Sequence, residues 1–279
     1  DIEDIGFNRP CTQPLGATVG LYNYHLLLCT GGSPDAWPSD PTKFHAFAAE
    51  TKSLLKKRKG DIKSSVKMGL CNFEKNASTD TWDFLCFDGS SCKKICNVTS
   101  ETLPSLIDYF NNDKPSLKVE SLPFESVILV CCHTSRDKRC GHCGPIIHDL
   151  FEKEASSINA RVVKVSHVGG HAYAANVIVY PEGNWYGYIK PEDVVRIVDS
   201  IKSGKVLYEK WRGRCGMDMA QQVEASPNPN PKSLKKVKGS TTSKTPADTK
   251  KSESSFPSLL FVFVIAVVVA AVGAQFFMK

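Results

Sequence analysis

The stretch Ser126-Val-Ile-Leu-Val-Cys-Cys-His-Thr-Ser-Arg-Asp-Lys-Arg-Cys-Gly-His-Cys-Gly-Pro145 decides how this chain folds. Its first five residues are typical of a buried strand. Pro145 favours the first turn of a helix, which we predict over residues 144–156. A strand that runs through a loop rich in cysteine and histidine into a helix indicates an α/β fold with a reactive loop at the strand's end.

The residues that follow complete a recognisable unit. They predict a strand over 162–165, a hairpin of strands 176–180 and 185–189, and a helix over 191–202. Strand, helix, strand, hairpin and helix is the element order of a thioredoxin-like domain.

The first half of the chain repeats this order with weaker signals and without a repeat at the level of residues. We expect a strand over 19–28, a helix over 43–59, strands over 66–73 and 81–87, and a helix over 103–110. The fold class predicted is therefore α/β, with two thioredoxin-like lobes. Residues 1–115 form the first, degenerate lobe, and residues 116–221 form the second.

The composition is that of a globular protein with an unusually high number of cysteines. The 279 residues are 42% hydrophobic and 23% charged, so the chain can bury a core. Its eleven cysteines cannot all pair, and the chain is longer than the small secreted domains that disulfides hold together. Metal or redox chemistry explains such cysteines better than a disulfide framework does.

The positive charge lies mainly outside the predicted lobes. The chain carries a net charge of +6, and residues 223–255 hold seven lysines against three acidic residues, a net +4. Because the lobes are close to neutral, we predict no nucleic-acid partner. The lysine-, serine- and proline-rich residues 222–255 lack an apolar period and are predicted to be a disordered linker.

Residues 256–279 form an apolar C-terminal segment. From Leu259 to Met278 it carries no charge, and a helix of this length spans about 30 Å, the thickness of a bilayer core. We therefore expect a transmembrane tail anchor that leaves the body in the cytosol, on the endoplasmic reticulum or on an organelle's outer membrane. The acidic start Asp1-Ile-Glu-Asp-Ile5 is unlike a secretory signal.

Candidate ligands stand on two loops that such a fold brings to one end of the sheet. The first loop contains Cys131, Cys132, Cys140 and Cys143, and the second is His167-Val-Gly-Gly-His171. Two adjacent glycines disfavour a helix and let the backbone wrap closely around a bound group. Cysteine thiolates and imidazoles are the usual ligands of zinc and of iron–sulfur clusters.

These residues resemble the sucrase/ferredoxin-like family, including its plant-like members. The resemblance covers roughly residues 5–216 and is carried by several short motifs: Gly6-Phe-Asn-Arg-Pro10, Ala36-Trp-Pro38, Arg136-Asp-Lys-Arg-Cys-Gly141, His167-Val-Gly-Gly-His-Ala-Tyr-Ala-Ala-Asn176, Trp185-Tyr-Gly-Tyr188 and Trp211-Arg-Gly213. It implies a thioredoxin-like ferredoxin whose 2Fe–2S cluster is held by Cys131, Cys140, His167 and His171. Cys132 and Cys143 are alternative cysteine ligands.

The resemblance implies an electron-transfer protein rather than an enzyme with its own substrate. Its partners would be a redox donor, a redox acceptor and a membrane. Two histidines in place of two cysteines raise the reduction potential of such a cluster, and an imidazole can couple electron uptake to a proton.

Two other functions use the same residues. Cys140-Gly-His-Cys143 has the CxxC spacing of a thiol–disulfide oxidoreductase. Two cysteines and two histidines can equally hold a structural zinc ion in an interaction module.

Overall fold

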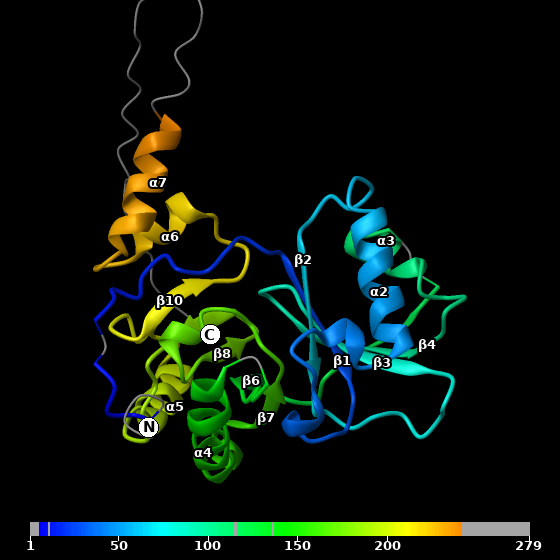
Figure 1. Cartoon of the computed structure of the whole chain (residues 1–279), viewed down its shortest axis with the longest axis horizontal. Helices are drawn as coiled ribbons and strands as arrows, with labels where there is room; N and C mark the ends of the chain where they lie inside the picture. The colour runs from blue at the N-terminus through cyan, green and yellow to red at the C-terminus, as the bar shows by residue number, and fades with distance from the viewer. Residues whose placement is uncertain (1–5, 11, 114–115, 136, 242–279) are drawn as a thin grey trace, which may run out of the picture. The chain divides into compact units, whose positions relative to one another are not determined.

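The computed structural model describes residues 6–10, 12–113, 116–135 and 137–241. The first half, drawn from blue to cyan-green in Figure 1, contains these helices and strands: β1 (Tyr24–Cys29), α2 (Ala46–Lys57), β2 (Val66–Cys71), β3 (Trp82–Phe87), β4 (Cys92–Val98), α3 (Ser105–Phe110) and β5 (Lys118–Ser121). The second half contains β6 (Ser126–Cys131), α4 (Lys138–Ala155), β7 (Ala160–Val165), β8 (Val177–Tyr180), β9 (Asn184–Tyr186), α5 (Asp193–Ser203) and β10 (Trp211–Arg214). Two further helices follow, α6 (Met219–Ala225) and α7 (Pro231–Thr241).

In the described part of the chain the strands form one ten-stranded sheet. Its order is β10-β9-β8-β6-β7-β2-β1-β3-β4-β5. The pairs β1–β2 and β6–β7 are parallel, the other pairs are antiparallel, and the halves join through Cys71 of β2 and Val165 of β7. Read outward from this junction, both halves have the same strand order. The α/β fold and the repeated thioredoxin-like order expected from the sequence are thus present in the structure.

One boundary differs from the predicted division. β5 follows residue 115 in the chain but pairs with β4, so it extends the sheet of the first half. A strand this short and largely exposed has too few apolar residues to be found by periodicity.

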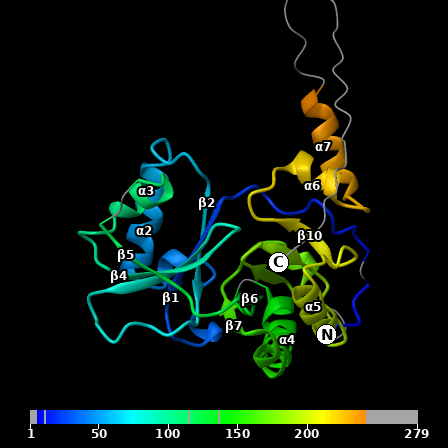
Figure 2. The same ribbon diagram turned by 180° about the vertical axis from the view of Figure 1, so that it is seen from behind.

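Both faces of the sheet are covered in the second half. Alternate residues of β6 face opposite ways, because successive side chains of a strand do so. Val127, Leu129 and Cys131 belong to an apolar cluster shared by both halves of the sheet. Ile128 and Val130 belong to a second cluster, which includes residues of α4 and α5. Figure 2 shows these two helices beside β6 and β7, with α2 and α3 against the strands of the first half.

Helix α4 begins earlier than the sequence predicts. We place its start at Gly144 because proline favours a first turn, but the helix begins at Lys138 and contains Pro145. The Asp137 carboxylate caps the helix by accepting a hydrogen bond from the Arg139 backbone N–H, 3.0 Å away. The cysteines at 140 and 143 therefore lie on a helix and not in a loop.

A glycine lets this helix approach the strand closely. A Cβ atom on Gly144 would lie 2.3 Å from the Cys131 carbonyl oxygen and 2.9 Å from the Cys132 Cα. Both are backbone atoms, which cannot move aside as a flexible side chain can. Gly144 therefore sets the distance between α4 and the end of β6.

The predicted disordered linker is wrong for residues 222–241. They complete α6 and form α7, which lie together near β10 in Figure 1. Polar contacts to the N-terminal segment hold them: Gln222 Nε2 donates to the Val19 carbonyl, and Asn230 Nδ2 donates to the Pro14 carbonyl. Periodicity of apolar residues does not register such contacts.

No helix among the described residues is both long enough and apolar enough to cross a membrane. The predicted anchor over residues 256–279 lies outside the described residues.

We expect Gly144→Ala to destabilise the protein by about 1–3 kcal/mol, because its methyl group would force α4 away from β6. Urea unfolding followed by circular dichroism measures this. Gly20→Ala is the matched control, since a Cβ there meets nothing within 4 Å and should change stability by no more than about 0.5 kcal/mol. Equal stabilities for the two variants would contradict the close approach.

Candidate metal centre

Three of the four predicted ligands converge at the end of β6. Cys131 is the last residue of this strand, Cys140 lies in the first turn of α4, and His167 follows β7. One ligand atom from each residue lies within 4.8 Å of the other two. Both cysteines are buried and His167 is half-buried. Two sulfurs and a nitrogen this close form a soft donor set of the kind that binds zinc or iron.

The two thiols share one negative charge. The pKa of Cys131 is held well below its ordinary value, chiefly because the Cys140 side chain hydrogen-bonds to its thiolate. Hydrogen bonds from His167 and from the backbone of Val168 and His133 also lower the pKa of Cys131. Together with the Cys140 hydrogen bond they outweigh the effect of burial, which raises this pKa. The pKa of Cys140 is raised, because the neighbouring thiolate and burial both disfavour a second charge. A metal ion would neutralise this charge and release the Cys140 proton.

One of the two ring nitrogens of His167 is buried without a hydrogen bond to any described residue. Its Nδ1 atom is inaccessible to solvent and has no hydrogen-bond partner among the described residues. A buried, unsatisfied polar atom costs about 1–3 kcal/mol. Coordination would satisfy it, so the residues present fit a metal or cluster bound by thiolates and imidazole.

His171, the fourth predicted ligand, lies beside this group. Its ring centroid is 5.7 Å from that of His167, and 45% of its side chain is exposed. Its Nε2 atom faces the Asp137 carboxylate at 3.9 Å. The structure therefore places His171 at the solvent-facing edge of the centre, outside the tight group of three.

The two alternative cysteine ligands lie elsewhere. Cys132 and Cys143 both belong to the apolar cluster that includes Ile147, whereas Cys131 and Cys140 belong to the cluster that spans both halves. Burial among apolar residues raises the pKa of both Cys132 and Cys143. Neither environment favours the thiolate that a metal ligand requires.

The side chain of Arg212 packs against the loop between His167 and His171. Gly170 has φ = 71°, a left-handed conformation that glycine adopts readily, and a Cβ there would lie 2.3 Å from Nη2 of Arg212. Asn176 links the two, because its Nδ2 donates to the Gly170 carbonyl at 3.0 Å and its Oδ1 accepts from Arg212 Nη1 at 2.7 Å. Arg212 and Asn176 both stand in the motifs quoted above, but nothing in those motifs indicates this contact between them.

His133 is a second buried histidine near the centre. Its Nε2 lies 3.1 Å from both the Pro38 carbonyl oxygen and the Ser135 hydroxyl, and its ring centroid is 6.3 Å from that of His167. Its Nδ1 also has no partner among the described residues. Contacts to the first half of the chain thus position the loop that follows Cys131.

Arg212 has a cationic neighbour on β2. Lys67 lies with its Nζ 5.5 Å from the centroid of the Trp185 ring. Burial, and then repulsion from Arg212, lower the pKa of Lys67 to about 8. Among the described residues neither cation forms an ion pair with a carboxylate.

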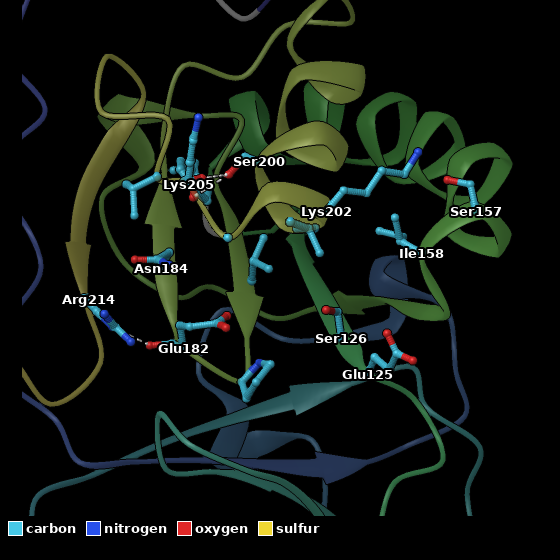
Figure 3. A pocket seen from close by; sticks show the side chains of 16 residues that line it. Glu125, Ser126, Ser157, Ile158, Glu182, Asn184, Ser200, Lys202, Lys205 and Arg214 are labelled. Carbon is cyan, nitrogen blue, oxygen red and sulfur yellow. Dashed lines mark hydrogen bonds between the residues drawn. The ribbon is translucent and has the colours of Figure 1, made fainter. Parts of the chain in front are cut away.

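A cavity of about 490 Å³ lies away from the centre, at the opposite end of β6 (Figure 3). Ser126, the first residue of the strand, lines it, and Arg214 Nε donates to the Glu182 carbonyl at its rim. Its charged lining residues have both signs, as in Glu125 and Lys202. It is separate from the group at Cys131.

Comparison with known proteins places most of the chain in one family. Residues 15–213 match the model of the sucrase/ferredoxin-like family. Altered inheritance of mitochondria protein 32 from Meyerozyma guilliermondii is 43% identical over 97 residues, which are 32% of this chain and 34% of that protein. The protein of the same name from Debaryomyces hansenii is 44% identical over 97 residues, 32% of this chain and 36% of that protein. The chain thus spans about a third of the length of these relatives.

Among solved structures, a thioredoxin-like [2Fe-2S] ferredoxin from Aquifex aeolicus is similar to part of the chain. It is 20% identical, with a TM-score of 0.30, over 33% of this chain and 93% of that protein.

We expect Lys67→Met to stabilise the protein by about 1–3 kcal/mol at pH 7, because it removes a half-buried charge that burial and repulsion from Arg212 disfavour. The sign follows from the lowered pKa. Below about pH 8 the lysine is protonated in both states and its full penalty is present, and above its unfolded value near 10.5 it is neutral in both. The difference in unfolding free energy between wild type and variant should therefore shrink as the pH rises from 8 to 10.5. A difference that does not change with pH would contradict this.

Proposed function

We propose, from the premise that this chain belongs to the sucrase/ferredoxin-like family, that it is an electron carrier whose 2Fe–2S cluster is held by Cys131, Cys140, His167 and His171. One observation carries the proposal. Two buried thiols, at the end of β6 and in the first turn of α4, and an imidazole with an unpartnered buried nitrogen, in the loop after β7, lie within 4.8 Å of one another.

When bound, such a cluster takes up and releases one electron, and its imidazole ligands raise its potential above that of an all-cysteine ferredoxin. The protein's own residues do the rest. The apolar cluster around Cys131 and Cys140 excludes water from the thiolate side, and the backbone at Val168 and His133 supports the thiolate. His171 is the exposed member, so the edge of the centre at His171 is where an electron would pass to or from a partner.

Asp137 places a negative charge at this edge. The pKa of its carboxyl is lowered, first by the hydrogen bond from Arg139 and also by His171, so it is a carboxylate at neutral pH. Its oxygen lies 3.9 Å from His171 Nε2, beside the exposed imidazole.

A membrane tether remains part of the proposal. It rests on the apolar sequence of residues 256–279 and would hold the carrier close to membrane-bound partners. The relatives' name connects them with the inheritance of mitochondria, and we propose a setting connected with mitochondria for this chain too.

The geometry weakens the dithiol alternative more than the zinc alternative. Cys140 and Cys143 belong to different apolar clusters, and the pKa of each thiol is raised, whereas a redox-active pair needs a reactive thiolate. A zinc ion would use the same donor atoms as a cluster, and metal analysis separates the two.

We expect the full chain, purified without oxygen, to be coloured and to contain two irons and two sulfides. Cys131→Ser, Cys140→Ser and His167→Ala should each lose most of the iron and change the visible and electron paramagnetic resonance spectra, because each removes a ligand. Cys132→Ser and Cys143→Ser are matched controls that should keep both, since their thiols lie in the other cluster. Colourless protein that contains zinc, or iron that survives in the ligand variants, would overturn the proposal.

We expect the midpoint potential to fall as the pH rises, by up to about 59 mV per pH unit where one proton accompanies the electron. Asp137→Asn should raise the midpoint potential, because it removes a negative charge 3.9 Å from His171 Nε2 and so favours the reduced, more negative centre. Asparagine also caps helices well, so the fold should be kept. Potentiometry at several pH values measures this, and identical curves for the variant and wild type would argue against an effect of Asp137 on the centre.

A further inference from the structure

A second cavity lies directly behind the loop that joins the two histidines. It has a volume of about 460 Å³, within the usual range for a small-molecule site. Gly169 and Gly170 form one wall, Lys67 of β2 and Trp185 of β9 form others, and Arg212 of β10 completes it. The cysteines of the metal centre do not line it, so it is a separate space.

Its charged lining residues are both cationic, and no acidic residue among the described ones pairs with them. Arg212 is only 2% exposed, and its hydrogen-bond partners among the described residues are the neutral groups of Thr18 and Asn176. Lys67 is half-buried, and it lines the same cavity without an acidic partner in the described part of the chain. None of the described lining residues is acidic. The Cys131 sulfur attracts both cations from outside the cavity. A cavity that is lined by two cations and by no acidic residue among those described suits an anionic ligand.

Aromatic rings hold these cations in place. The Arg212 guanidinium carbon lies 4.5 Å from the centroid of the Tyr173 ring and 5.4 Å from that of Trp185. Trp185 is itself fixed, because its Nε1 donates to the Tyr22 hydroxyl at 2.6 Å. The cavity therefore offers two cations against rigid apolar walls, which suits a ligand that has a charged end and an apolar body.

We propose that this cavity binds a small organic anion, a carboxylate or phosphate ester with an aromatic or aliphatic body, through Lys67 and Arg212. The anion would add a counter-charge inside the cavity, and its body would lie against Tyr22, Tyr173 and Trp185. Inorganic phosphate would satisfy the charge but leave the apolar walls unfilled.

The site stands beside the candidate metal centre but does not depend on it. Gly170 separates His167 and His171 from Arg212, so a ligand here would lie immediately behind the loop that carries both histidines. Binding is therefore measured directly, and the result does not require iron or any redox activity.

Calorimetric titration of the full chain with 2-naphthoate tests the proposal, with neutral 2-naphthamide and inorganic phosphate as comparison ligands. 2-Naphthoate should bind at least about tenfold more tightly than either. Lys67→Met should weaken its binding about tenfold or more, and Lys63→Met, which removes an exposed lysine outside the cavity, should leave it unchanged. Arg212 is not varied, because its removal would disturb the histidine loop.

A second variant tests the cavity without changing Lys67. A Cβ on Gly20, another lining residue, meets nothing within 4 Å, so Gly20→Trp should place its ring in the cavity and abolish binding without unfolding the chain. Equal affinity for 2-naphthoate and 2-naphthamide, equal affinity for phosphate, or binding that survives both Lys67→Met and Gly20→Trp would overturn the proposal.

Discussion

The close contact between helix α4 and the end of strand β6 is the constraint on which the candidate centre depends. A side chain at Gly144 would collide with the backbone of Cys131, so the helix can rest on the strand only because this position has no Cβ. The contact brings Cys140, one turn earlier, to within reach of Cys131. It also places the helix cap at Asp137 beside His171. Ligands and their polar surroundings are thus fixed together by one packing contact.

The two faces of β6 give adjacent cysteines opposite chemistry. Cys131 meets a second thiol, an imidazole and backbone hydrogen bonds, which together stabilise a thiolate. Cys132, the next residue, points into an apolar cluster that stabilises the neutral thiol. On the helix, Cys140 belongs to the cluster of Cys131, and Cys143 belongs to that of Cys132. Alternation along the strand therefore separates Cys131 from Cys132, and the packing of α4 against β6 assigns one helix cysteine to each cluster.

Much of this arrangement could be predicted from the sequence, and the omissions share a physical reason. Apolar runs indicated seven of the ten strands, all but β4, β5 and β10, and the helices α2 to α5, and the clustered cysteines and histidines indicated the centre. The start of α4 was missed because its cap at Asp137 is a single polar contact, and α7 was missed because polar groups such as Asn230 hold it. Arg212 supports the histidine loop through partners that are 36 and 194 residues away in the chain. The pattern of neighbouring residues in the sequence cannot reveal contacts between residues so far apart in the chain.

The repeated strand order raises the question of why only one half builds a metal site. Cys29 ends β1 as Cys131 ends β6, but the residue two positions after the neighbouring strand is Phe73 in the first half and His167 in the second. The connection to the following helix also differs, since residues 30–45 precede α2 whereas only 132–137 precede α4. The longer connection brings no cysteine over Cys29, whose Sγ instead lies 4.0 Å from that of Cys71. It extends toward the other half, where the Pro38 carbonyl contacts His133 and the Trp37 carbonyl accepts from Ser135. The first half of the chain thus supports the centre by holding the loop that follows Cys131 in place.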